Sequence, residues 1–199
     1  MGLRIASEAV NLGTMDGADH EHSDDELMVA YATGDPQAFE VLYRRHKNVL
    51  YGYIYRHAQD RALTDELFQD VWQNVIKARA NYEPQGHFLA WIMRIAQHRL
   101  DDYWRAKSHR PNAPTDSETR VAALSDERTP ETEATAFGQR RALRMALSEL
   151  PDEQRTVLLL RLEQELTLEQ IAEVTGTSRE TVKSRLRYAM DKLRQRLQA

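Results

Sequence analysis

Residues 167–197 contain two amphipathic segments separated by a single glycine, TLEQIAEVTGTSRETVKSRLRYAMDKLRQRL. Thr167 is a favourable N-cap residue, and Gln170 follows it at the spacing of a capping box. Gly176 ends the first segment, because glycine adopts the left-handed conformation without a Cβ clash. Ser178 is placed to cap the second segment. The pattern predicts a short helix, a tight turn and a longer helix.

The longer segment has two distinct faces. Arg179, Lys183 and Arg187 lie four residues apart on one of them. The apolar residues of the other face recur at steps of three and four: Val182, Leu186, Ala189, Met190, Leu193 and Leu197. This arrangement is typical of a helix-turn-helix, whose second helix enters the major groove of DNA. A helical hairpin with a solvated basic face is the alternative interpretation.

The charge of the chain is unusual for a protein that binds DNA unaided. The net charge is −4, whereas phosphate contacts normally demand a basic excess. The charge is also segregated. Residues 1–26 carry one arginine and seven acids, and residues 178–199 carry two acids and the basic residues Arg179, Lys183, Arg185, Arg187, Lys192, Arg194 and Arg196. This separation indicates a protein that engages DNA with the help of a partner.

Composition favours an all-α protein, because charged residues make up 29% of the chain and glycine and proline are few. There is no cysteine, which excludes disulfides and thiolate metal sites. His20 and His22 lack a third ligand at a known spacing, so we expect no metal. No apolar run reaches the roughly 20 residues of a membrane span, and the N-terminus is unlike a secretory signal. We therefore expect a cytoplasmic protein without membrane insertion.

Two small helical domains are expected. Residues 1–22 form a disordered acidic tail, and a capping box at Ser23 and Glu26 opens a first domain at residues 23–107. Residues 108–136, with Pro111, Pro114 and Pro130, form a flexible acidic linker. Residues 137–199 form the second domain, which contains the helix-turn-helix.

Two stretches of the first domain have surfaces suited to contact. In LTDELFQDVWQNVIKA a polar face with a neighbouring tryptophan is either solvated or a docking surface. In FLAWIMRIAQHRLDDYWRAK, arginines alternate with aromatic residues, as in surfaces that bind single-stranded nucleic acid. Trp91 lies in the middle of the apolar stripe and is expected in the core, while Trp104 and Arg105 are better placed for contact. Glycine-rich phosphate loops and catalytic motifs are missing, so no enzymatic activity and no cofactor are expected.

Three stretches in this order resemble bacterial RNA polymerase sigma factors of the extracytoplasmic-function (ECF) group in the sigma-70 family. DELFQDVWQNVIKA resembles the polymerase-docking part of region 2, and AWIMRIAQHRLDDYWR resembles its minus-10 part. LPDEQRTVLLLRLEQELTLEQIAEVTGTSRETVKSRLRYAMDKLRQRL resembles region 4, which reads the minus-35 element. The resemblance covers about residues 24–197. It implies a region 2 helical bundle and a region 4 helix-turn-helix joined by the linker.

The resemblance also implies three sets of contact residues. Those that bind the polymerase clamp helices are Glu66, Gln69, Asp70 and Trp72. Those that contact the minus-10 element are Arg94, Gln97, His98, Arg99, Trp104 and Arg105. Those that contact the minus-35 element are Arg179, Thr181, Lys183, Ser184, Arg185, Arg187 and Tyr188. His98 stands where the family commonly has asparagine, so the minus-10 base preference does not transfer.

The implied partners are core RNA polymerase, through its clamp helices and flap, promoter DNA, and an anti-sigma factor that masks both polymerase-binding domains. The implied function is promoter-specific initiation by an alternative sigma factor that responds to stress or another signal. The alternatives from the residues alone are a stand-alone helix-turn-helix regulator and a helical protein-interaction module.

Overall fold

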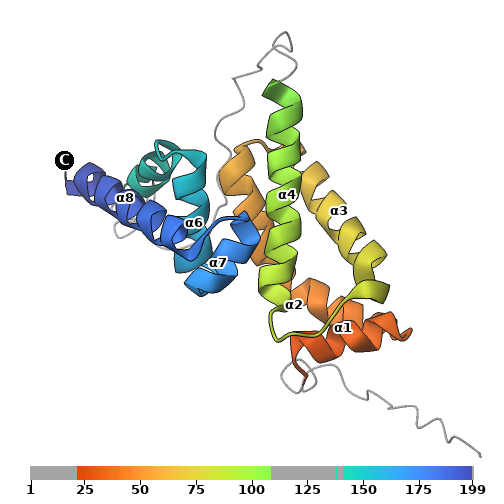
Figure 1. The fold of residues 1–199 in the computed structure, drawn as a ribbon. Coiled ribbons are helices and arrows are strands. Elements are labelled where there is room, and N and C mark those ends of the chain that lie inside the picture. Colours follow the sequence, from red (N-terminus) through yellow and green to blue (C-terminus); the bar gives the residue numbers. More distant parts are fainter. Residues whose placement is uncertain (1–21, 109–137, 139–140, 199) are drawn as a thin grey trace, which may run out of the picture.

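The computed structural model of the protein describes residues 22–108, 138 and 141–198. The predicted tail and linker fall almost entirely outside these residues. The described ranges contain no strand, and the expected all-α fold is confirmed (Figure 1). The elements, in chain order, are α1 (Asp24–Ala32), α2 (Pro36–Ala58), α3 (Arg61–Ala78), the 3-10 turn η2 (Arg79–Asn81), α4 (Phe88–Ser108), α6 (Asp152–Leu162), α7 (Leu168–Thr175) and α8 (Arg179–Gln198). A further helical stretch covers residues 141–148, before α6.

Local side-chain caps set the ends of the N-terminal helices. The Ser23 hydroxyl accepts a hydrogen bond from the Glu26 amide at 3.2 Å, and the Glu26 carboxylate accepts one from the Ser23 amide at 2.7 Å. This is the predicted capping box of α1. Asp35 caps α2 ahead of Pro36, and Asp60 caps α3 through the Leu63 amide at 2.7 Å. These caps satisfy amides that the helices themselves leave without partners.

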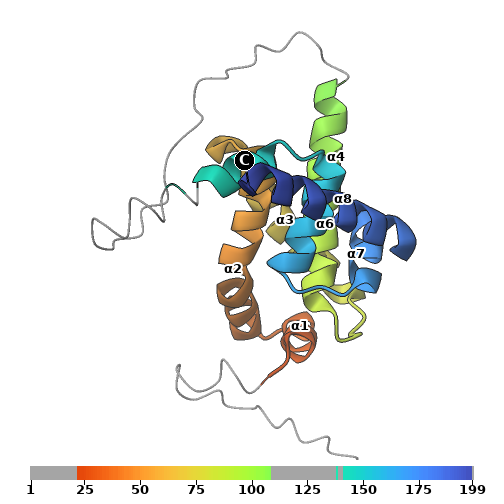
Figure 2. The same cartoon turned by 90° about the vertical axis from the view of Figure 1, so that its left-hand side faces the viewer.

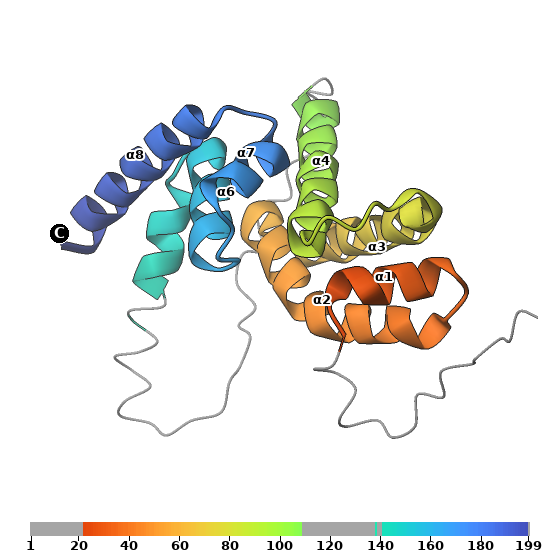
Figure 3. The same ribbon diagram turned by 60° about the horizontal axis from the view of Figure 1, so that its bottom comes forward.

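The first four helices surround one apolar core. α1 packs on α2, and α4 contacts both α2 and α3 (Figures 1 and 3). Each helix contributes side chains with almost no exposed area, among them Met28, Leu42, Val71 and Ile92. Removing such side chains from water is the main stabilising contribution to a bundle of this kind.

The C-terminal helices bury a second set of apolar residues. Leu160, Ile171 and Val182, from α6, α7 and α8, are fully buried. A separate small cluster gathers Ala146, Leu150, Leu158, Ala189 and Leu193. The expected apolar face of α8 is wrong at two positions, since Met190 and Leu197 are 41% and 52% exposed. Helical periodicity overestimated this face, because among the described residues no neighbouring helix covers these side chains.

The two halves of the molecule pack directly against each other. α7 lies against α4, as the views in Figures 1 and 2 agree, and residues of both halves share one apolar cluster. Four polar contacts between described residues cross the boundary, one of them from the Arg155 guanidinium to the Arg56 carbonyl at 3.4 Å. The His57 ring lies 3.0 Å from the Thr156 hydroxyl, Arg56 pairs with Glu163 at 3.0 Å, and the Gln170 amide lies 2.9 Å from His87. The domain boundaries drawn from the sequence remain a prediction.

None of the helices in the described ranges is long and apolar enough to cross a membrane. The same residues hold no group of three or more acidic, histidine or cysteine side chains arranged around a common metal position.

Candidate nucleic-acid interface

The turn before α8 has the predicted geometry. Thr167 and Gln170 form a capping box at the start of α7. Gly176, at φ 62°, ends α7 in the left-handed region. The Ser178 hydroxyl then accepts a hydrogen bond from the Thr181 amide at 3.1 Å, which caps α8. α7 and α8 are thereby held as the two helices of a helix-turn-helix.

One side of α8 is buried and the opposite side is open. Val182 and Ala189 have no exposed area, which fixes the rotation of α8 about its axis. The predicted minus-35 residues on the outer side are exposed: Lys183, Ser184, Arg187 and Tyr188, with Thr181 half-buried beside them. The Arg187 guanidinium lies 5.0 Å from the centroid of the Tyr188 ring. We call these five residues the α8 face.

The other two predicted minus-35 residues pair with carboxylates. The Arg179 Nε atom lies 2.5 Å from a carboxylate oxygen of Glu169 on α7. The Arg185 side chain is 22% exposed, and its Nη2 atom lies 2.5 Å from Glu153 on α6. The pKa of the Glu169 carboxyl is held below its usual value, first by a backbone hydrogen bond and then by Arg179. Both arginines therefore brace α8 against its neighbours, and a phosphate contact requires them to exchange partners.

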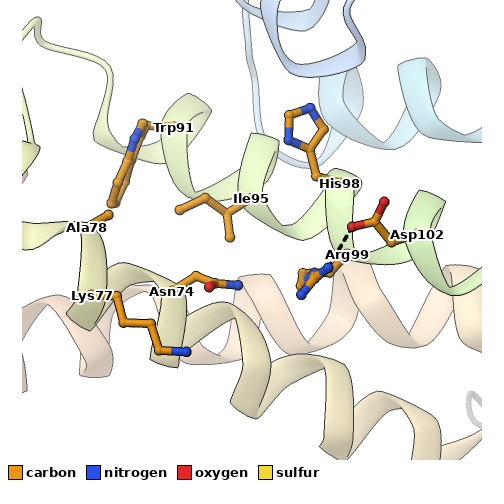
Figure 4. A pocket seen from close by; sticks show the side chains of 8 residues that line it. All are labelled: Asn74, Lys77, Ala78, Trp91, Ile95, His98, Arg99 and Asp102. Carbon is orange, nitrogen blue, oxygen red and sulfur yellow. Dashed lines mark hydrogen bonds and ion pairs between the residues drawn. The ribbon is translucent and has the colours of Figure 1, made fainter.

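A hollow of about 530 Å³ lies between α3 and α4 (Figure 4). Its wall from α3 is formed by Asn74, Lys77 and Ala78, and its wall from α4 by Trp91, Ile95, His98, Arg99 and Asp102. We call it the α3–α4 hollow. Arg99 donates to Asp102 at 2.6 Å, the dashed line in Figure 4. The hollow thus combines an indole ring, an imidazole and two cations around an open space, which suits a planar, polar ring near a phosphate.

The structure separates the predicted minus-10 residues. His98 and Arg99 line the α3–α4 hollow, and Arg94 is exposed one turn before His98. Gln97 points elsewhere, because its amide oxygen accepts from the Tyr53 hydroxyl at 2.5 Å and its amide nitrogen donates to Asp101 at 2.8 Å. Gln97 therefore contributes to packing between helices in this conformation.

The end of α4 carries the remaining two. Trp104 is 37% exposed, and Lys107 lies 5.2 Å from the centroid of its ring. Arg105 lies 3.3 Å from Asp102 and is exposed. This end of α4 is therefore a basic and aromatic surface, as predicted. Trp91 differs from the prediction, since it is half-buried and lines the hollow instead of lying within the core.

The predicted polymerase-binding residues on α3 also differ in their exposure. Glu66 and Gln69 are exposed and Asp70 is half-buried. Trp72 is only 5% exposed, because aromatic residues of α2 close over it. Its ring packs against Phe39 at 5.6 Å and Tyr43 at 5.0 Å between centroids. Trp72 thus packs beneath the exposed residues of the predicted polymerase-binding face.

Sequence reasoning missed the long-range polar connections, among them those of Asp25 and His57. Asp25 binds the loop before α4, where it accepts from the Tyr82 hydroxyl at 2.5 Å and from the Gly86 amide. His57 reaches across the two halves to Thr156. Their partners lie 57 or more residues away along the chain. Local spacing holds no signal for contacts at such separations.

Comparison with known proteins agrees with this geometry. Residues 42–110 match the family model described as Sigma-70 region 2, and residues 146–195 match that of Sigma-70, region 4. The ECF RNA polymerase sigma factor SigM of Mycobacterium tuberculosis is 32% identical over 178 residues, which cover 89% of this chain and 86% of SigM. The RNA polymerase sigma factor CarQ of Myxococcus xanthus is 31% identical over 173 residues, which cover 85% of this chain and 95% of CarQ.

Solved structures share the fold. CnrH, in complex with the cytosolic domain of CnrY, superposes with a TM-score of 0.65 at 23% identity, covering 88% of this chain and 97% of CnrH. The sigma factor RpoE of Bartonella quintana, in complex with the anti-sigma factor NepR, superposes with a TM-score of 0.67 at 17% identity, covering 81% of this chain and 97% of that chain. The chain matches both sigma regions and is 32% identical to SigM over 89% of its own length. It therefore belongs to the sigma-70 family, in the ECF group of RNA polymerase sigma factors.

Proposed function

We propose that this sigma factor divides promoter recognition between its two halves. The α8 face reads the minus-35 element as duplex DNA, and α4 with the α3–α4 hollow holds an opened strand of the minus-10 element. The polar face of α3 binds the clamp helices of core RNA polymerase. In this proposal the regions 23–107 and 137–199 act as separate domains, and the whole assembly works in the cytoplasm, where polymerase and chromosome meet.

The observation that carries the minus-35 proposal is the open α8 face. Lys183, Ser184 and Arg187 point away from the buried side chains of Val182 and Ala189. Arginine and lysine pair with guanine in the major groove, and each good bidentate pair contributes about 1–3 kcal/mol of discrimination. Arg179 and Arg185 flank this face and exchange their carboxylate partners for phosphates when DNA binds.

The minus-10 proposal is supported by the contents of the α3–α4 hollow. Trp91 offers a ring for stacking, and His98 offers both a ring and two nitrogen atoms for hydrogen bonds. Lys77 and Arg99 supply positive charge for the adjoining phosphates. Arg94, Trp104 and Arg105 extend this surface along the exposed side of α4. Base stacking on such rings contributes about 1–3 kcal/mol per base.

The polymerase and an anti-sigma factor complete the proposed set of partners. Glu66 and Gln69 are exposed on α3, where they are available to a basic or polar partner surface. Of the solved proteins with this fold, RpoE is bound to the anti-sigma factor NepR and CnrH to the cytosolic domain of CnrY. We extend this relation to the present chain, whose activity an anti-sigma factor would hold in check until a stress or other signal releases it. The chain itself performs no catalysis and needs no cofactor.

Reconstituted transcription with core RNA polymerase tests the proposal. Lys183→Ala and Arg187→Ala should each weaken promoter binding by holoenzyme about tenfold, the loss of one base contact, and leave affinity for core unchanged. Glu66→Ala with Asp70→Ala should do the reverse. Arg194→Ala is the matched control, because Arg194 is an exposed cation of α8 that pairs with Asp191 outside the α8 face.

The alternative drawn from the residues alone is a stand-alone helix-turn-helix regulator. It predicts tight, sequence-specific DNA binding by the free chain and no initiation when core polymerase is added. That combination of results would overturn the sigma-factor roles assigned to the individual residues.

A further inference from the structure

The loop between η2 and α4, residues 82–87, is tied to α1 by one carboxylate. Asp25 accepts a hydrogen bond from the Tyr82 hydroxyl at 2.5 Å with one oxygen, and from the Gly86 amide with the other. Gly86 has φ 76°, in the left-handed region that favours glycine. A single side chain therefore fixes both the beginning and the end of this loop.

Tyr82 connects this tie to the α3–α4 hollow. Its ring packs edge-on against the ring of Trp91, with 4.9 Å between centroids. Trp91 is the indole that lines the hollow, and its ring also lies 5.8 Å from that of Phe88, between centroids. Contact between Tyr82 and Trp91 thus restricts the orientations that the indole can adopt.

The hydrogen bond that holds Tyr82 is of the strong kind. A phenol that donates to a carboxylate makes a charge-assisted bond, shorter and stronger than a neutral one. Burial, and then the Asp25 carboxylate, raise the pKa of the Tyr82 phenol. Tyr82 therefore keeps its proton near neutral pH and remains a donor to Asp25.

We propose that Asp25 is a positioning residue for minus-10 recognition: through Tyr82 and Gly86 it holds the loop and the Trp91 ring in the orientation that receives an unstacked base. Asp25 acts through these neighbours and is not itself a DNA contact. The inference rests on the proposed role of the α3–α4 hollow as the site of that base. It adds α1, which supplies none of the predicted contacts, to the machinery of promoter opening.

Asp24 provides a matched control on the same helix. It too lies in the first turn of α1, so replacing either residue removes one negative charge from the same helix N-terminus. Its carboxylate binds α2 instead of the loop, through Arg45 at 2.7 Å and His46 at 2.8 Å. A defect that comes only from looser packing of α1 would therefore appear in Asp24→Ala as well as in Asp25→Ala.

The test uses holoenzyme assembled from core polymerase and the full chain, with 2-aminopurine in the non-template strand of the minus-10 element of a promoter that the wild type opens. This probe brightens when a base leaves the stack. Asp25→Ala and Tyr82→Phe should each reduce the brightening about tenfold at equal holoenzyme occupancy. Tyr82→Phe retains the ring and loses only the hydroxyl, so it reports on the hydrogen bond even where Asp25→Ala reduces folding. The double variant should be no worse than Asp25→Ala, because both changes remove the same bond.

Core affinity should stay within twofold of wild type in all of these variants, and Asp24→Ala should retain the wild-type signal. An equal loss in Asp24→Ala, or an unchanged signal in both Asp25→Ala and Tyr82→Phe, would overturn the positioning role. Trp91→Ala distinguishes a failure of the hollow as the base site from a failure of the positioning role of Asp25. An unchanged signal in Trp91→Ala rejects the hollow as the base site, whereas a lost signal there with a normal Asp25→Ala rejects only the role of Asp25.

Discussion

Some residues of the predicted contact sets are exposed and others are buried beneath them, and residue type alone does not distinguish the two. Trp72 is the clearest case. It lies next to the exposed residues of the predicted polymerase-binding face in the sequence, yet only 5% of its area is exposed. Its indole nitrogen has no hydrogen-bond partner within the part of the chain that the structure describes. The interleaving of Phe39 and Tyr43 from α2 accounts for this position. Burial of the Trp72 ring therefore predicts that it acts on polymerase binding through the shape of α3 and not by direct contact.

This placement leads to a prediction for stability. Trp72→Ala should lower the free energy of unfolding by about 3–5 kcal/mol, as for other large buried aromatic residues, and should weaken core binding as a consequence. Trp72→Phe retains most of the packing and should lose much less of both. Urea unfolding and core affinity, measured on the same preparations, check this. A Trp72→Ala protein with wild-type stability and no core binding would instead make Trp72 a direct contact.

Helix ends are the features that local sequence predicts best. The capping boxes at Ser23 and Thr167 and the left-handed Gly176 were all expected, because their partners lie within three or four residues. A cap of this kind contributes roughly 1 kcal/mol and sets the first turn of a helix. The cap at Thr167 and the turn at Gly176 together determine the angle between α7 and α8, and so the orientation of the α8 face.

The turn between α7 and α8 can be tested by a substitution at Gly176. No atom of the described residues beyond its chain neighbours lies within 4 Å of a Cβ atom built there, so the obstacle to a side chain is the backbone angle φ of 62°. Gly176→Ala should therefore cost about 1–2 kcal/mol of stability from left-handed strain alone, and should weaken minus-35 binding by changing the turn. Gly176→Asn should cost less, since asparagine adopts this conformation more readily. Equal stability of the Ala and Asn variants would contradict this account.

Across the whole molecule, predictability follows the distance between partners along the chain. Helical periodicity predicted Val182, Ala189 and Leu193 on the apolar face of α8, and all three are buried. It could not identify the tie from Asp25 to Tyr82 or the contact from His57 to Thr156, which join residues 57 and 99 positions apart. The family resemblance implied that the two halves have different functions. It could not predict the packing of α7 on α4, because that packing depends on the surfaces of both halves at once. The α3–α4 hollow was missed for the same reason, since its residues come from two helices.

His57 is the buried titratable group at the boundary between the halves. Its Nδ1 atom lies 2.9 Å from the Tyr53 carbonyl, which only accepts, so Nδ1 carries the proton and Nε2 accepts from the Thr156 hydroxyl at 3.0 Å. Burial lowers the pKa of His57 to about 4. The backbone hydrogen bond from Nδ1 and the charge of Asp152 oppose this effect, while the charges of Arg155 and Arg56 add to it. The packed arrangement of the two halves thus requires a neutral His57 imidazole.

The free energy of unfolding should consequently fall as the pH falls from about 6.5 to about 4. In this range the unfolded chain binds a proton on His57 that the packed halves exclude. The loss between pH 7 and pH 5 is about 2 kcal/mol for this one group, at 1.36 kcal/mol per pKa unit. Urea unfolding of the wild type and of His57→Gln at both pH values measures it, since glutamine can bond to both partners and does not titrate. The difference between the two proteins isolates His57 from the acidic residues, which titrate in both. A wild type whose stability changes with pH in parallel with His57→Gln would show that His57 is protonated without opening the boundary between the halves.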